Sequence, residues 1–134
     1  MKLRLLILPV IALLLQSCGG NVGVSTFIKA ADAADGVYRF ETDLSDSLSA
    51  YDISFYTRIA EPLMLEVDWI SPSAVPSLKD SVWVEPAGRK AVFALYRSGV
   101  CPEEKGVWTI AVRPSAVPKG FCGLGIVAKK NGTR

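Results

Sequence analysis

The feature that most restricts the fold of this chain is a two-residue repeat in its hydrophobic pattern. Between Tyr51 and Ile59, every second side chain is apolar or a threonine, and most of the intervening side chains are polar. Leu63 to Trp69 alternates in the same way, with Glu66 and Asp68 on the opposite side. Side chains point to opposite faces along a β-strand, whereas a helix repeats every 3.6 residues. Both segments are therefore predicted to be strands with one buried face.

Five further segments are predicted to be strands, because they are separated by residues rich in Pro, Gly, Ser and Asp that favour turns. They are Val37–Glu41, Ser81–Glu85, Arg89–Tyr96, Trp108–Val112 and Phe121–Lys130. Arg89–Tyr96 is so evenly apolar that a helix remains an alternative, although its β-branched and aromatic residues favour a strand. About seven strands without a convincing amphipathic helix indicate an all-β chain. The expected architecture is an antiparallel β-sandwich, immunoglobulin-like or jelly-roll-like.

The first 18 residues have the composition of a bacterial lipoprotein signal. Two basic residues precede the uncharged run Leu5–Leu15, which is shorter than the roughly 20 residues that a membrane-spanning helix requires. The run ends in Leu15-Gln16-Ser17-Cys18, which resembles a lipobox. Residues 1–17 are thus predicted to be a signal peptide, and Cys18 to be lipidated, for example with palmitate. An ordinary signal peptide with an incidental cysteine is the alternative.

The chain after the signal peptide is predicted to contain one domain. Removing residues 1–17 from 134 leaves 117, enough for a single hydrophobic core. Residues 18–35 are predicted to be the acylated cysteine and a flexible tether, since they begin with small residues and show no sustained apolar face. A short turn or an added strand around Thr26 to Lys29 is left open. Residues 36–134 are assigned to the β-sandwich domain.

Charge and composition exclude several classes of function. Lys2 and Arg4 lie in the leader, so the 15 Lys and Arg residues of the full chain become 13, equal to the 13 Asp and Glu residues. With no net charge, the chain offers no broad electrostatic case for nucleic acid binding, which would require a clustered basic surface. The sequence contains no histidine, which excludes Ser-His-Asp and Cys-His catalysis and histidine metal ligation. No cofactor is expected.

Cys101 and Cys122 are the two cysteines that remain after lipidation of Cys18. An even pair in an oxidising compartment predicts a disulfide, which would stabilise the fold by roughly 3 kcal/mol. Two buried free thiols are the alternative.

Few residues suggest a site. Glu103 and Glu104 are adjacent on a predicted loop, and Asp52, Glu66 and Asp68 lie on polar strand faces, so all five are expected to be solvated rather than catalytic. Asp43 to Ser47 lacks the ligand spacing of a calcium loop. Trp69 and Trp108 are predicted core residues. Trp83 and Tyr56 lie among polar neighbours, and are the candidates for contact with a partner or a glycan.

The order of motifs resembles that of the gliding-motility-associated lipoproteins of the GldH type. After the lipobox come Tyr38-Arg39-Phe40-Glu41, the strand Tyr51 to Arg58, and the strand and proline turn Leu63 to Pro72. Lys79-Asp80-Ser81-Val82, Gly106 to Arg113 and Gly123 to Ile126 follow in the same order as in that family. The link Ala60-Glu61-Pro62 is shorter than in the family, and the region Pro86 to Glu104 is compressed.

The resemblance implies a non-enzymatic envelope lipoprotein associated with the gliding machinery, acting by contact with envelope proteins. Gly19 follows Cys18 directly, which resembles the pattern in lipoproteins that are sent to the outer membrane. The expected location is therefore the inner leaflet of the outer membrane, facing the periplasm. The expected partners are the lipid bilayer, through acylated Cys18, and envelope proteins, with no nucleic acid. The alternative function is glycan binding through an exposed aromatic sheet face that includes Trp83 and Tyr56.

Overall fold

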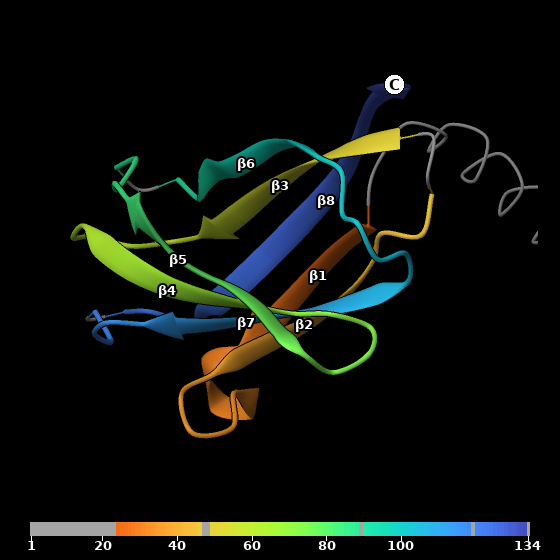
Figure 1. The fold of residues 1–134 in the computed structure, drawn as a ribbon. Coiled ribbons are helices and arrows are strands. Elements are labelled where there is room, and N and C mark those ends of the chain that lie inside the picture. The colour runs from red at the N-terminus through yellow and green to blue at the C-terminus, as the bar shows by residue number, and fades with distance from the viewer. Residues whose placement is uncertain (1–23, 47–48, 89, 119, 134) are drawn as a thin grey trace, which may run out of the picture.

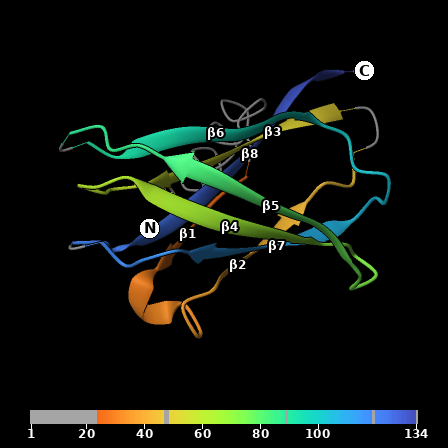
Figure 2. The same cartoon turned by 60° about the vertical axis from the view of Figure 1, so that its left-hand side comes forward.

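Two antiparallel sheets of four strands pack face to face in the computed structural model, which describes residues 24–46, 49–88, 90–118 and 120–133 (Figure 1). The first sheet has the strand order β1-β8-β3-β6, and the second has the order β2-β7-β4-β5. Figure 2 shows the sheets as separate layers, with β6 and β3 in one and β5, β4 and β7 in the other. The all-β sandwich expected from the sequence is confirmed.

The strands and their bounds are as follows. The first sheet contains β1 (Val24–Lys29), β3 (Ser49–Thr57), β6 (Val92–Val100) and β8 (Gly123–Thr133). The second contains β2 (Tyr38–Asp43), β4 (Leu63–Ile70), β5 (Pro76–Val84) and β7 (Val107–Pro114). A single 3₁₀ turn, η1 (Ala30–Asp32), follows β1.

The core lies between the sheets and is built from the alternating rows that the sequence predicts. In β3 and β4 every second side chain is buried, from Tyr51 to Thr57 and from Leu63 to Trp69. Trp108, Ile110 and Val112 of β7 face the same interior, with Trp69 and Trp108 only 4% and 6% exposed. Both indoles are therefore core residues, as expected, and burial of such side chains is the main driving force for the fold.

The largest differences from the sequence prediction concern three strands. Val24–Lys29 is a strand paired in register with β8, so the first sheet includes part of the segment assigned to the tether. Arg89–Tyr96 contributes a strand rather than a helix, but β6 begins at Val92 and continues to Val100. β5 starts at Pro76 rather than Ser81, which is possible because β5 is an edge strand, where proline removes no required hydrogen bond.

The sandwich has two lateral edges, and they differ. At one edge β1 and β2 are joined directly through η1 and a short turn. At the other, β5 and β6 are the outermost strands of their sheets, and neither has a second strand partner among the described residues. Among the residues that the structure describes, no helix is long and apolar enough to cross a bilayer.

Candidate functional site

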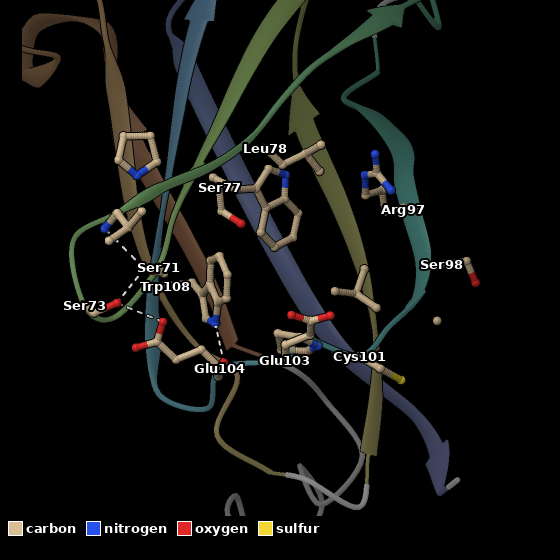
Figure 3. A pocket seen from close by; sticks show the side chains of 16 residues that line it. Ser71, Ser73, Ser77, Leu78, Arg97, Ser98, Cys101, Glu103, Glu104 and Trp108 are labelled. Atoms are coloured by element: carbon tan, nitrogen blue, oxygen red, sulfur yellow. Dashed lines mark hydrogen bonds between the residues drawn. The ribbon is translucent and has the colours of Figure 1, made fainter.

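A cavity of about 700 Å³ opens at the edge formed by β5 and β6 (Figure 3). The β4–β5 connection and the start of β5 form one wall, with the exposed apolar side chains of Val75 and Leu78. The end of β6 and the β6–β7 connection form the other. The core indoles of Trp69 and Trp108 line it from the interior. The cavity thus joins the hydrophobic core to the surface.

A network of hydrogen bonds spans the gap between the two sheets beside this cavity. The indole N–H of Trp69 donates to the Tyr96 hydroxyl at 2.8 Å, and this hydroxyl donates to Asp80 Oδ2 at 2.9 Å. Arg97 forms an ion pair with the same oxygen, from Nη2 at 2.6 Å and from Nε at 3.0 Å. Trp69 and Asp80 belong to the second sheet, and Tyr96 and Arg97 to the first. The network therefore connects edge strands that share no backbone ladder.

The network changes the acidity of its members. Partial burial opposes ionisation of Asp80, but the hydrogen bonds from Arg97, the Ser81 N–H and Tyr96 outweigh it, so the pKa of Asp80 is lowered. Burial raises the pKa of Tyr96, because the phenolate would lose hydration. Asp80 is thus held as a carboxylate that anchors Arg97, while Tyr96 remains a neutral donor.

Polar groups fix the outer rim of the cavity. Ser71 and Ser73 share a hydrogen bond of 3.0 Å, and Ser73 donates to the Glu104 carboxylate at 3.0 Å. The backbone carbonyl of Glu104 accepts a bond from the Trp108 indole at 2.9 Å, which ties the β6–β7 connection to the core (Figure 3). The Glu103 side chain points toward the middle of the cavity in Figure 3. Its carboxylate accepts no hydrogen bond from the described part of the chain.

A row of aromatic rings crosses the outer face of the first sheet. Phe27, Gly125, Tyr56 and Phe93 lie opposite one another on four adjacent strands, in the order β1, β8, β3, β6. Tyr56 stacks on Phe27, with ring centroids 5.7 Å apart, and on Phe93, at 5.3 Å. A methyl group on Gly125 would overlap the Tyr56 ring, so the glycine is what lets this ring lie flat on the sheet.

Trp83 and Tyr56, the two predicted contact residues, do not form one site. Trp83 is 51% exposed on the outer face of the second sheet, opposite Met64, and its indole N–H donates to Glu85 at 2.7 Å. Tyr56 is half-buried on the outer face of the first sheet. Because the hydrophobic core separates these faces, a ligand that contacts both residues is incompatible with the fold.

The predicted disulfide is wrong for this structure. Cys101 and Cys122 are both free and exposed. Cys101 follows the end of β6 that lies beside Tyr51, whereas Cys122 precedes β8, whose Gly125 lies beside Tyr56. The two cysteines are thus about nine residues apart along the direction of β3, or roughly 30 Å, and a disulfide needs Cα atoms within about 7 Å. Separation along the sequence gave no information about this distance.

The other predicted positions are dispersed. Cys18 and the signal peptide lie outside the described residues. Asp52 is on the outer face of the first sheet, while Glu66 and Asp68 are on that of the second. Within the described ranges, no group of three or more Cys, Asp and Glu side chains could hold a metal ion. Asp80, Tyr96 and Arg97 were not predicted as a group, because they come from two strands whose proximity no local pattern reveals.

Comparison with known proteins found no significant match to a family model, a curated protein or a solved structure.

Proposed function

We propose that this chain is a non-enzymatic envelope lipoprotein, anchored through acylated Cys18, that acts by contact with another protein in a gliding-motility-associated assembly. The leader and its lipobox support the anchor, and the motif order that resembles the GldH-type lipoproteins supports the kind of assembly. The inner leaflet of the outer membrane, facing the periplasm, is the proposed location.

The open edge between β5 and β6 carries the proposal of protein contact. Edge strands present unpaired N–H and C=O groups, to which an extended segment of another protein can add as a further strand. Here the two edges flank a cavity with apolar side chains at Val75 and Leu78, which offers pockets for alternate side chains of such a segment. The occupant is therefore an extended segment of an envelope protein.

The charges around the cavity define this segment further. The charge of Arg97 is compensated by its ion pair with Asp80. The Glu104 carboxylate accepts a hydrogen bond from Ser73, which holds it at the rim of the cavity. Glu103 is the acidic group that faces the cavity without such a bond. A lysine or arginine beside apolar residues in the partner segment complements this arrangement.

Site-specific crosslinking tests the contact in cells. A photoreactive phenylalanine analogue replaces Leu78 in the cavity or, as a matched control, Val107, an exposed apolar side chain on the outer face of the second sheet. We expect a discrete adduct with one envelope protein from position 78 alone. The yield of this adduct should fall in a Glu103→Lys background, and should fall only in part with Glu103→Gln. The same adduct from both positions, or none from position 78, would refute the contact.

The anchor has a separate test. Labelled palmitate is expected to enter the wild-type protein and not a Cys18→Ala variant.

Deletion of the gene is expected to impair gliding while leaving the envelope intact; loss of envelope integrity alone would place the protein in another assembly.

Glycan binding is the second candidate, favoured by the exposed ring row of Phe27, Tyr56 and Phe93, because aromatic faces stack on sugar rings. Quenching of protein fluorescence by saccharides tests it. A Phe93→Ala variant should then lose the quenching and a Trp83→Ala variant should keep it, since Trp83 lies on the other sheet.

A further inference from the structure

The outer face of the first sheet is organised in four parallel rows of side chains. The row of Phe27, Gly125, Tyr56 and Phe93 is adjacent to the row of Ser25, Val127, Ser54 and Leu95. Phe93 is 69% exposed, Leu95 59% and Phe27 45%. Together with Tyr56 and Val127, these side chains form a continuous apolar surface, which we call the aromatic face. A contiguous apolar surface of this kind is typical of a contact site.

Cations flank the aromatic face. Lys29 of β1 and Arg58, just beyond β3, are exposed at one end, level with Gly123. Lys129 of β8 is exposed at the other end, next to Asp52. The carboxylate of Asp52 accepts bonds from Ser98, the Gly99 N–H and Asn131, and is the acidic side chain among the outward-facing strand positions of this sheet. Three cations and one carboxylate give this face a formal charge of plus two.

The position of the anchor keeps this face within reach of a bilayer. Five residues separate Cys18 from Val24, the first residue of β1. Even a fully extended link of six Cα steps covers at most about 21 Å. β1 is an edge strand of the first sheet, and Phe27 is three residues beyond its start. An acylated Cys18 thus holds the aromatic face within one domain width of the lipid.

We propose that the aromatic face docks on the membrane surface, with Phe27, Tyr56, Phe93 and Leu95 at the boundary between headgroups and acyl chains, and with Lys29 and Arg58 on anionic phospholipid headgroups. This inference rests on the proposed lipid anchor and adds an orientation to it. Exposed aromatic residues beside basic residues are the combination that interfacial binding uses. The docked orientation leaves the β5–β6 cavity at the side and the second sheet facing away from the lipid.

Two matched serines provide the test. Ser54 lies within the aromatic face, and Ser81 lies on the outer face of the second sheet, opposite Glu66. Each is replaced by cysteine in the lipidated full-length protein with Cys101→Ser and Cys122→Ser, and is labelled with an environment-sensitive fluorophore. The protein is reconstituted in vesicles of phosphatidylethanolamine and phosphatidylglycerol that contain brominated lipid as a quencher.

We expect quenching of the label at position 54 and little at position 81. Lys29→Glu with Arg58→Glu should weaken docking, whereas Arg39→Glu with Arg113→Glu on the other sheet should leave it unchanged. Removal of the two cations alone should lower the docking equilibrium constant about 25-fold, since each contributes about fivefold near an anionic surface. The charge reversal should exceed this.

The outcomes separate this inference from the proposed function. Equal quenching at both positions, or at neither, in a protein that incorporates palmitate refutes the docked face and leaves the anchor intact. Failure to incorporate palmitate refutes the anchor. In that case, binding of the unacylated chain to the same vesicles, with quenching only at position 54, would still support docking through the aromatic face. Quenching at position 54 by a soluble saccharide, without a response to lipid, overturns the inference in favour of a glycan site.

Discussion

The outer faces of the two sheets have the same backbone architecture and opposite surface chemistry. On the second sheet, Arg39, Lys79 and Arg113 alternate with Glu41, Asp43, Glu66 and Asp68, and two pairs of opposite charges lie across from each other, Glu66 with Arg113 and Asp68 with Lys79. On the first sheet, rings and aliphatic side chains occupy the centre and cations lie at the ends. The second face is mainly charged, with exposed apolar side chains at Trp83 and Val107, whereas the first has an apolar centre available for a contact. A β-sandwich can thus use one outer face for solubility and the other for binding.

Gly125→Val should have the largest effect on the outer face of the first sheet. The added side chain would overlap the Tyr56 ring and displace the stacked row. We expect a loss of about 2 to 3 kcal/mol in the free energy of unfolding, because overpacking and lost ring contacts add. Chemical denaturation measures this loss. Ala111→Val, at the centre of the second sheet between Arg39 and Asp68, is the control and should cost less than about 1 kcal/mol. Equal losses would show that the ring row has no special role.

Asp80→Asn tests the connection between the sheets at the open edge. The variant loses the ion pair with Arg97, and we expect about 1 kcal/mol of destabilisation at neutral pH. Because folding lowers the pKa of Asp80, its contribution is present above the unfolded value, near 4, and is lost as the pH falls through the folded value. Urea denaturation should therefore show a gap between wild type and variant that is constant near pH 7 and narrows below about pH 4.

The control for this prediction is Asp68→Asn, on the exposed face of the second sheet opposite Lys79. Exposed charges contribute little even when an opposite charge is close, so the stability should change by less than about 0.5 kcal/mol. A gap for Asp80→Asn that persists unchanged in acid would mean that the carboxylate is not the group that stabilises the edge.

Phe93→Ala and Trp83→Ala compare two exposed aromatic residues on opposite faces. Phe93 stacks on Tyr56, and its loss should cost about 0.5 kcal/mol. Trp83 makes one exposed hydrogen bond, to Glu85, and its loss should cost no more. Vesicle docking is the discriminating measurement, and only Phe93→Ala should reduce it. A loss of docking with Trp83→Ala would assign the contact to the second sheet.

The smallest effect is expected from reduction of the protein. Since Cys101 and Cys122 lie at opposite ends of the first sheet, both thiols should be alkylated without reductant and the Tm should not change when reductant is added. Mass spectrometry counts the alkylated thiols. Protection of both until reduction would show that the cysteines meet in solution, and would contradict the strand register described above.

The sequence predicted the parts of the fold that depend on local alternation. The buried faces of β3, β4 and β7 follow from the period of two, because one solvated face and one buried face require it. It left β1 undecided between a turn and an added strand, because Val24–Lys29 carries little apolar signal; pairing with β8 makes it a strand. Neither Phe27 nor Phe93 was singled out, since each stands alone in its own segment and becomes part of a surface only beside Tyr56.

By itself, the sequence determined that the chain is all-β. It also determined which side of most strands faces inward, because burial selects the apolar face of each strand independently of its neighbours. It also excluded histidine chemistry. The tertiary structure alone decided which strands are adjacent, and hence the cavity at the β5–β6 edge, the ring row across β1, β8, β3 and β6, the Asp80 network and the separation of the two thiols. These features depend on strand order and register, which are set by long-range pairing and packing rather than by any local pattern.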